Sequence, residues 1–311
     1  MSCLICGSIA FDTIMTFDGR FVDHILPAQL NILNVSFTVP TMRREFGGCA
    51  SNIAYSYKLL GGDPVVMGVM GDDAQSYLAH FAAMNISTQH VRILPNTFTA
   101  QAIITTDLDH NQITSFHPGA ITQGHLNKVS DVLQPIDLAI IAPESTRAML
   151  EHAEQCASAG IPFIFDPGHM LGTFSREELL HTIDLASYVA VNQYEAAWLA
   201  EKTQCTLGEL AARVNALIMT RGDQGATMIV GNQTYEIPSI VPSALVDPTG
   251  CGDAFRAGLL FGITQQMDWP TIARLANLLG SITVECRGPQ SHLFTLDEIR
   301  ERFTKIFGYR F

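Results

Sequence analysis

The chain has 311 residues, which is enough for one large α/β domain or for two domains of ordinary size. Apolar residues make up 47% of it and charged residues only 15%, so we expect a sizeable buried core. The formal net charge of −12 argues against a general binding surface for nucleic acids or anionic membranes. We therefore expect neither a nucleic acid nor a membrane as a partner.

Targeting signals and cysteines indicate the cellular compartment. The start of the chain lacks a charged segment followed by an apolar one, and no apolar run reaches about 18 residues, so we expect a cytoplasmic protein. Seven cysteines scattered through core-like segments favour reduced thiols. Cys3 and Cys6 have the spacing of a redox motif, but positions three apart in a strand face opposite sides. We interpret that spacing as structural. The histidines show no metal-ligand spacing, so we predict no zinc site.

Short apolar runs alternate with amphipathic segments of helix length along the chain. The runs predict buried strands at residues 4–10, 65–70, 137–142, 162–165, 188–191 and 217–220. The amphipathic segments predict helices at residues 74–84, 146–158, 177–185, 195–202 and 207–214. Because the strands are continuously apolar rather than alternating, we expect a sheet covered by helices on both faces and therefore mainly parallel.

The remainder of the chain completes this α/β pattern. Gly231 and Asn232 predict a hairpin turn within residues 227–240, at one edge of the sheet. The last third is almost entirely helical in pattern, over residues 254–263, 271–285 and 297–307. No polar linker or internal repeat interrupts the sequence, so we expect a single α/β domain over residues 1–311.

Two inserted segments break the alternation. Residues 13–44 carry many large apolar side chains and precede a glycine pair. Residues 100–116 alternate between apolar and polar side chains around the polar stretch 107–111, which predicts a second hairpin.

The run DPTGCGDA at residues 247–254 is the most informative motif. Its two glycines bracket a tight turn that leads into an apolar helical segment. The N–H groups of Gly250, Cys251 and Gly252 can hold a phosphate there, because N–H groups at a helix N-terminus attract anions. A carboxylate would repel a phosphate that it only had to bind, but it suits a base that deprotonates an attacking hydroxyl. The motif therefore favours phosphoryl transfer with Asp253 as catalytic base.

Other glycine-rich sites fit this run less well. A dinucleotide fingerprint needs a third glycine three residues after Gly252, where Phe255 stands. A nucleotide P-loop needs a lysine, and none occurs between Lys202 and Lys305. An ordinary strand-to-helix turn, with Asp253 as a carboxylate at the helix start, remains the alternative.

At this point the sequence resembles the ribokinase-like, or phosphofructokinase-B type, kinases. The resemblance rests on EFGGCASNIA at 45–54, NQYE at 192–195, TRGDQG at 220–225 and DPTGCGDAF at 247–255, and it covers nearly the whole chain. It implies a mainly parallel central sheet flanked by helices. It also implies a small β-sheet lid built from the two inserted segments, and an ATP-dependent kinase that uses Mg²⁺.

The resemblance implies roles for four residues in binding the ATP phosphates, Mg²⁺ or K⁺. Asn192 and Glu195 stand three residues apart where a strand gives way to a helix, which places both side chains near the same helix end. On their own they fit a helix cap with a solvated glutamate; the resemblance implies contacts to the ATP phosphates and, for Glu195, to Mg²⁺ through water. Asp247 and Thr249 resemble the loop that holds potassium in ribokinase, so a K⁺ site is a further hypothesis.

The nucleotide side follows from the same resemblance. Thr220, Arg221, Gly222 and Gly225 come after a strand, at the carboxyl edge where open α/β sheets bind ligands. The resemblance implies that this turn contacts the phosphates of ATP. Asn277 matches a helix position that lies near the adenine in relatives.

Four residues form the predicted acceptor side: Asp12, Gly47, Gly48 and Asn52. We expect Asp12 to end the first strand, where its carboxylate can accept hydrogen bonds from two neighbouring hydroxyls of a ribose-like sugar. A turn cap is the alternative for that aspartate. The glycine pair lets the backbone approach the sugar, and Asn52 can both donate and accept at ring hydroxyls.

The acceptor itself is a nucleoside or a free sugar. Stacking of a nucleobase contributes about 1–3 kcal/mol, and residues 13–44 are unusually apolar for a site that recognises only hydroxyls. Together with MRREFGG at 42–48 and FHPGA at 116–120, which begins with Phe116, they look most like the bacterial adenosine and nucleoside kinase branch. We therefore favour adenosine or a related nucleoside over ribose or fructose. Alternatively, these apolar residues form the lid's own core or a homodimer contact, and Arg43 and Arg44 bind a sugar phosphate.

A rival class is a catalytically inactive regulator that binds a small molecule on the same fold. The intact base Asp253, with its flanking glycines and the pair Asn192 and Glu195, argues against it.

Overall fold

Two sheets organise the part of the chain that the computed structural model describes, residues 1–25, 31–32, 34–109 and 111–311. The larger sheet has the order β13-β12-β11-β10-β9-β8-β1-β4-β5. Its pairings are parallel from β5 to β11, and antiparallel from β11 to β12 and from β12 to β13. The strands are β1 (Ser2–Cys6), β4 (Asp63–Met70), β5 (Val91–Ile93), β8 (Leu138–Ile141), β9 (Phe163–Phe165), β10 (Tyr188–Asn192), β11 (Ala216–Thr220), β12 (Ala226–Val230) and β13 (Gln233–Ile237).

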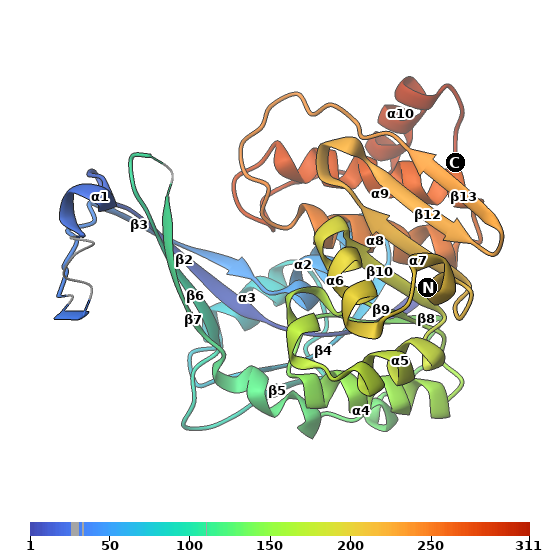
Figure 1. The fold of residues 1–311 in the computed structure, drawn as a ribbon, viewed down its shortest axis with the longest axis horizontal. Coiled ribbons are helices and arrows are strands. Elements are labelled where there is room, and N and C mark those ends of the chain that lie inside the picture. The colour runs from blue at the N-terminus through green and yellow to red at the C-terminus, as the bar shows by residue number, and fades with distance from the viewer. Residues whose placement is uncertain (26–30, 33, 110) are drawn as a thin grey trace.

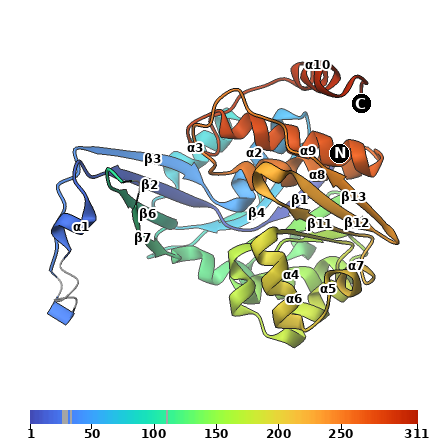
Figure 2. The ribbon, with the colours of Figure 1, turned by 45° about the horizontal axis from the view of Figure 1, so that its top comes forward.

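Helices cover both faces of this sheet (Figure 2). One face is covered by α2 (Cys49–Leu59), α3 (Gln75–Ala83), α8 (Cys251–Thr264), α9 (Trp269–Val284) and α10 (Leu296–Phe307). The other is covered by α4 (Thr146–Ser158), α5 (Arg176–Leu185), α6 (Gln193–Thr203) and α7 (Leu207–Ala211). Cys3 packs in the first of these cores and Cys6 in the second, so the two thiols lie on opposite faces of the sheet.

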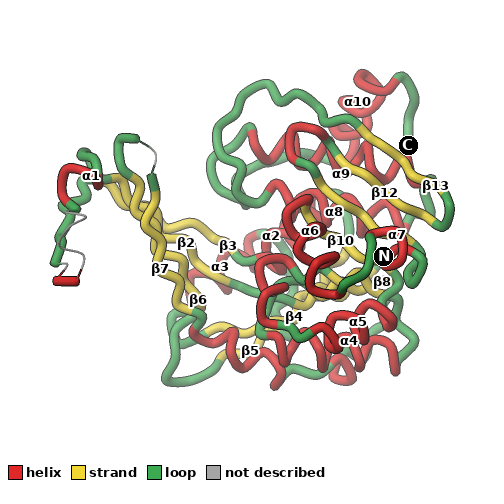
Figure 3. The backbone as a smooth tube through the Cα atoms, in the orientation of Figure 1, coloured by secondary structure: helices red, strands yellow, loops and turns green. Residues whose placement is uncertain are grey.

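The smaller sheet, which we call the lid, is an arm that projects from the main body (Figures 1 and 3). Its strands are β2 (Ala10–Thr16), β3 (Thr41–Gly47), β6 (Ala100–Thr106) and β7 (Gln112–His117), in the order β3-β2-β6-β7. The short helix α1 (Phe21–His24) follows β2. Residues 26–30 and 33 of the first inserted segment, and residue 110 of the second, lie outside the described residues.

The predicted fold class is confirmed, with a mainly parallel sheet between helical layers and a small second sheet. The predicted first strand is wrong. Residues 4–10 do not form one strand, because β1 ends at Cys6 and β2 begins at Ala10 in the lid. Asp12 therefore lies within a lid strand and does not end a strand of the central sheet. The apolar run misleads here because Ile9 and Phe11 are buried where the chain crosses between the sheets.

Two helices also differ from the sequence analysis. α2 was not predicted, because its residues 50–57 are all buried and it has no polar face to give an amphipathic pattern. α7 ends at Ala211, earlier than the predicted end, because the chain turns there to enter β11. Within the described residues, no helix is both long enough and apolar enough to cross a membrane.

The topology brings the functional motifs to one edge. The parallel strands β1, β8, β9, β10 and β11 all end at the same side of the sheet, the usual ligand edge of open α/β folds. The lid strands β2 and β3 and helix α8 begin or end beside this edge (Figure 1). Residues from both ends of the chain therefore meet around one site.

Candidate active site

The glycine turn is held in a conformation that only glycine adopts easily. Gly250 caps the N-terminus of α8 with a φ of 81°, and a Cβ there would collide with Pro289. The N–H of Cys251 donates to the Pro248 carbonyl at 3.2 Å and so closes the turn itself. Gly252 follows in the first turn of the helix, where N–H groups have no acceptor within the helix. The turn therefore presents backbone donors to an anion.

Asp253 lies in this same first turn and contacts the opposite wall of the site. The side-chain N–H of Asn52, from α2, donates to its Oδ2 at 2.8 Å. Burial raises the pKa of Asp253 to about 7, although the hydrogen bond from Asn52 and the charge of Arg256 lower it. A carboxyl group with a pKa near neutrality is suited to accept a proton from a hydroxyl.

A buried ion pair that the sequence analysis missed supports this helix. Arg256 Nε lies 2.9 Å from Asp166 Oδ2, and its Nη2 lies 3.1 Å from Asp166 Oδ1. Both side chains are more than 90% buried. Because Arg256 is one turn along α8 from Asp253, its charge opposes the effect of burial on the base. An arginine in an otherwise apolar helix is the signal that could have identified it.

Three of the four predicted acceptor residues line a cavity of about 280 Å³, slightly below the usual range for small-molecule sites. Asp12, Gly48 and Asn52 line it. Gly47 does not line it, but a Cβ there would lie 2.5 Å from the Asp12 carboxylate, so this glycine makes room for that side chain. Gly48 has a φ of 94°, and its Cβ would crowd the backbone at Ala10. The structure thus brings the four predicted residues together.

Burial and negative neighbours perturb Asp12. Its pKa rises to about 6, first because of burial and then because of the charges of Glu45 and Asp247. At neutral pH this carboxyl group is mainly ionised and can accept two hydroxyl hydrogen bonds.

The far wall of the cavity is largely apolar. Phe116, Pro118 and Ile121 come from the lid and the segment after it, and Pro143 and Met170 come from the main body. Such a surface matches a flat, apolar group attached to the sugar. Of these residues the sequence analysis included Phe116 and Pro118, in one motif, and the others approach the site through the fold.

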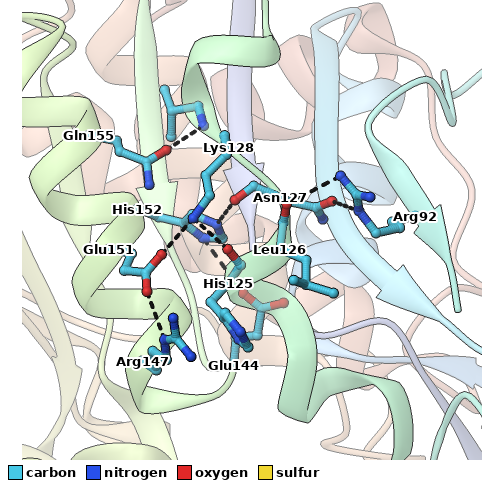
Figure 4. A network of polar contacts seen from close by, with 11 residues as sticks. Arg92, His125, Leu126, Asn127, Lys128, Glu144, Arg147, Glu151, His152 and Gln155 are labelled. Atoms are coloured by element: carbon cyan, nitrogen blue, oxygen red, sulfur yellow. Dashed lines mark hydrogen bonds and ion pairs between the residues drawn. The ribbon is translucent and has the colours of Figure 1, made fainter.

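One cavity-lining carboxyl group, Glu144, is almost wholly buried. Both of its oxygens lack a hydrogen-bond partner among the described residues, and burial raises its pKa to about 8. Its Oε2 lies 3.7 Å from Nδ1 of the buried His152, in the network of Figure 4. A Cβ at Gly124 would collide with this carboxyl group. Glu144 is therefore mainly protonated at neutral pH and acts as a neutral polar group.

Asn192 and Glu195 form a capping box at the start of α6. The N–H of Glu195 donates to Asn192 Oδ1 at 2.8 Å, and the N–H of Asn192 donates to Glu195 Oε2 at 2.7 Å. The structure thus shows the helix cap, with a glutamate that is half-buried rather than solvated. Burial and the nearby Asp166 raise the pKa of Glu195. This crowding of carboxylates fits Mg²⁺, which prefers oxygen ligands and would relieve their repulsion.

Four of the predicted nucleotide residues, Thr220, Arg221, Gly222 and Gly225, lie at the end of β11 and in the turn after it. Thr220 ends β11, and the N–H of Arg221 donates to the Gly225 carbonyl at 2.7 Å to close a tight turn. Gly222 and Gly225 both have positive φ, at 57° and 91°.

Two contacts fix this turn against its surroundings. The Arg221 guanidinium pairs with Glu236 on β13. Asn277, on α9, donates from Nδ2 to the Pro238 carbonyl just after β13 at 3.1 Å. The structure therefore places Asn277 beside the strand that the Arg221 turn also contacts.

The predicted potassium loop is closed by the protein's own groups. Asp247 accepts hydrogen bonds from the N–H of Thr249 at 3.0 Å and from the N–H of Gly288 at 3.1 Å. Arg43 Nη2 lies 3.6 Å from the same carboxylate. Burial opposes ionisation of Asp247, but these hydrogen bonds and the arginine lower its pKa overall. A monovalent cation would add to a loop that is already ordered.

The arginine pair has acidic partners of its own. Arg43 Nε lies 3.2 Å from Glu45 Oε1, in addition to its contact with Asp247. Arg44 pairs with Asp73 at 3.1 Å and lies 3.5 Å above the ring of Phe11. These contacts disfavour the alternative in which the two arginines bind a sugar phosphate.

Comparison with known proteins shows the family to which this chain belongs. Residues 12–295 match the model of the pfkB family carbohydrate kinases. The chain belongs to this family. It is therefore a phosphotransferase that acts on a hydroxyl acceptor, and the predicted family and enzyme class are confirmed.

Similar proteins include nucleoside kinases and a ribokinase. A structure of the Burkholderia thailandensis nucleoside kinase in complex with inosine is 52% identical, with a TM-score of 0.89 and 99% of both chains covered. A nucleoside kinase of Methanocaldococcus jannaschii is 29% identical over 88% of this chain and 90% of its own length. The ribokinase of Bacillus subtilis is also 29% identical, over 96% of this chain and 97% of its own.

Proposed function

We propose that this kinase transfers the γ-phosphate of ATP to the primary hydroxyl of a nucleoside, with adenosine or inosine as the leading acceptors. One observation carries the proposal. Asp253, whose pKa is about 7, stands in the first turn of α8 and is hydrogen-bonded at 2.8 Å to Asn52, which lines the acceptor cavity. A base and an anion-binding turn thus meet beside a cavity that holds a second carboxylate for a diol.

The side chains support a direct transfer. The acceptor hydroxyl gives its proton to Asp253 as its oxygen forms a bond to the γ-phosphorus, and the bond from that phosphorus to the ADP oxygen breaks. The N–H group of Gly252, in the first turn of α8, would face the charge that develops on the phosphoryl oxygens, whereas that of Cys251 is already bonded to the Pro248 carbonyl. The positive charge of Arg256 favours the ionised form of Asp253 and so limits the rise in its pKa.

A magnesium ion is part of the proposal. Glu195 is the carboxylate that would hold it, through water, and Asn192 keeps Glu195 oriented by the capping box. When bound, Mg²⁺ neutralises charge on the ATP phosphates.

The acceptor is assigned from the cavity. Asp12 provides a carboxylate for the 2′ and 3′ hydroxyls, and the wall of Phe116, Ile121 and Met170 provides apolar surface for a base. The nucleoside kinase that is 52% identical was determined with inosine, which supports a nucleoside. The similarity to a ribokinase keeps ribose as the alternative acceptor.

Further features of the proposal concern the whole protein. We assign residues 1–311 to one kinase domain with lid segments 13–44 and 100–116, and a cytoplasmic role in purine salvage. All seven cysteines lie in the described part of the chain and are free, as a reducing compartment requires. The exposed lid strand β7 supports a homodimer through the lid, because all of its residues are exposed, the apolar Ile113 included.

The experiment that tests the proposal is a coupled ADP-release assay with adenosine, inosine, ribose and fructose under one set of conditions. We expect kcat/KM to be highest for a nucleoside, because free ribose lacks the surface that covers the apolar wall. If ribose or fructose leads by about tenfold or more, the nucleoside assignment is wrong and the sugar-kinase alternative stands.

A further inference from the structure

A line of hydrogen bonds runs behind Asn52, away from the acceptor cavity. Gln290, in the loop between α9 and α10, donates from Nε2 to Asn52 Oδ1 at 2.8 Å and to the hydroxyl of Tyr77 at 2.9 Å. The Oε1 of Gln290 lies 2.8 Å from Nε2 of His80. Asn52 in turn donates to Asp253 at 2.8 Å. The line therefore joins α3, the loop, α2 and the base.

The direction of every bond in this line is fixed by one backbone carbonyl. The Tyr77 hydroxyl donates its single proton to the Gly47 carbonyl at 2.7 Å, so it can only accept from Gln290. The amide nitrogen of Gln290 must then face Tyr77 and Asn52, and its oxygen must face His80 as an acceptor. Asn52 consequently turns its oxygen toward Gln290 and its nitrogen toward Asp253.

We propose that Gln290 is a positioning residue, which orients the Asn52 amide so that its N–H group holds Asp253 for proton transfer. The inference rests on the proposed function, in which Asp253 is the base. With Asp253 Oδ2 held by Asn52, the other carboxylate oxygen would take the proton of the acceptor. A reversed Asn52 amide would set its oxygen against the carboxylate, and the repulsion would turn the base and weaken its ionised form.

His80 completes the line from the lid side. Its ring stacks on Phe46 of β3, with centroids 4.1 Å apart and planes within 4°. Burial lowers the pKa of His80, so at neutral pH the ring is uncharged and donates from Nε2 to Gln290. The orientation of the base is thus anchored on two residues at the end of one lid strand, Phe46 and Gly47.

Other ionisable groups also act on the Asp253 carboxyl. Arg256 favours its charged form and Asp166 disfavours it, whereas the thiol of Cys49 lies close enough to donate to it. Cys251 and Tyr77 also lie close enough to interact with its charge. Substitution of Gln290 leaves all of these groups in place.

Two substitutions of Gln290 separate orientation from packing. Gln290→Met keeps the size of the side chain but removes its donor and acceptor. Gln290→Glu keeps the shape but offers only an acceptor to Asn52, so the asparagine amide turns its nitrogen away from Asp253. Gln75→Met, on the exposed start of α3, is the matched control.

The first measurement needs no activity. We would follow the ¹³C carboxyl resonance of Asp253 with pH in the intact protein, assigned by its loss in Asp253→Asn. The Asp253 pKa should rise by about one unit in Gln290→Met, since one hydrogen bond to a carboxylate is weakened, and further in Gln290→Glu. Gln75→Met should leave it unchanged. His80→Phe, which keeps a ring on Phe46, should raise it by a smaller amount and tests the line if a Gln290 variant does not fold.

The second measurement is kinetic. We expect kcat at pH 7 to fall about tenfold in Gln290→Met and up to about a hundredfold in Gln290→Glu, with the KM for ATP unchanged. Equal losses in both variants with an unshifted Asp253 resonance would show that Gln290 only packs the loop, and the inference would be wrong. Wild-type protein that phosphorylates neither nucleosides nor sugars would overturn the proposed function instead, while the resonance would still decide the role of Gln290.

Discussion

The proposed acceptor side and the proposed nucleotide side of Asp253 are built differently. The acceptor side consists of side chains that are at least partly buried and come from distant parts of the chain, such as Asp12 and Asn52, held by the lid and α2. The nucleotide side consists of short local turns, such as the one from Arg221 to Gly225, whose bonds are mostly between backbone groups. We therefore expect substitutions on the acceptor side to change substrate selection. Substitutions on the nucleotide side should have smaller effects, because backbone hydrogen bonds hold those turns.

The largest effect should come from the residue shared by both sides. Asp253→Asn keeps an acceptor for the Asn52 N–H, so the fold and ATP binding should persist. The variant cannot take a proton, and kcat should fall by about 10²–10⁴-fold, the usual contribution of a positioned base. Steady-state kinetics with saturating ATP would measure this, and near wild-type turnover would remove Asp253 from the mechanism.

The next largest effect should be confined to the acceptor side. Asp12→Asn removes a charged acceptor for two hydroxyls, so the acceptor KM should rise about ten- to hundredfold while the KM for ATP changes little. The 2′- and 3′-deoxy forms of adenosine should be poor substrates of the wild-type enzyme for the same reason. An equal rise in both KM values would show that the two sides are not separable.

The pH dependence should reflect Asp253 before any group on the nucleotide side. Its pKa is raised to about 7 and only the ionised form can accept a proton. The value of kcat/KM should therefore fall as pH drops through about 7, approaching tenfold per pH unit below it. Protonation of Asp12, whose pKa is raised to about 6, should make kcat/KM fall more steeply below pH 6. A flat profile between pH 6 and 8, by assay of initial rates, would contradict a base with this pKa.

The smallest effect should come from potassium. Asp247 is already hydrogen-bonded to Thr249 and Gly288 and lies near Arg43, so the loop is ordered without a cation. We expect only a modest rate increase in K⁺ relative to a large organic cation at equal ionic strength. Equal rates would mean that the protein alone orders the turn.

The same contrast explains what the sequence could predict. The motif around Gly250 and Asp253 is local, and its glycine conformation, helix start and carboxylate all follow from adjacent residues. Most strands of the larger sheet and most helices also follow from local apolar patterns. The capping box of Asn192 and Glu195 needed only the spacing of the two residues.

Features that depend on distant contacts could not be predicted. Arg256 and Asp166 form their ion pair across 90 residues, and Gln290 reaches Asn52 across 238. Glu144 and Met170 line the cavity only because the strands before them end at the same edge. Asp12 was placed in the wrong strand because the buried side chains around it hid the crossing between sheets.

The central claim is that Asp253 deprotonates the primary hydroxyl of a nucleoside held by Asp12. The most direct measurement is identification of the product by ³¹P nuclear magnetic resonance after reaction of the wild-type enzyme with ATP, Mg²⁺ and adenosine or inosine. We predict a single new phosphomonoester, the nucleoside 5′-monophosphate, formed in equal amount to ADP. A phosphate on the 2′ or 3′ hydroxyl, or ADP formed without any nucleoside phosphate, would contradict the account.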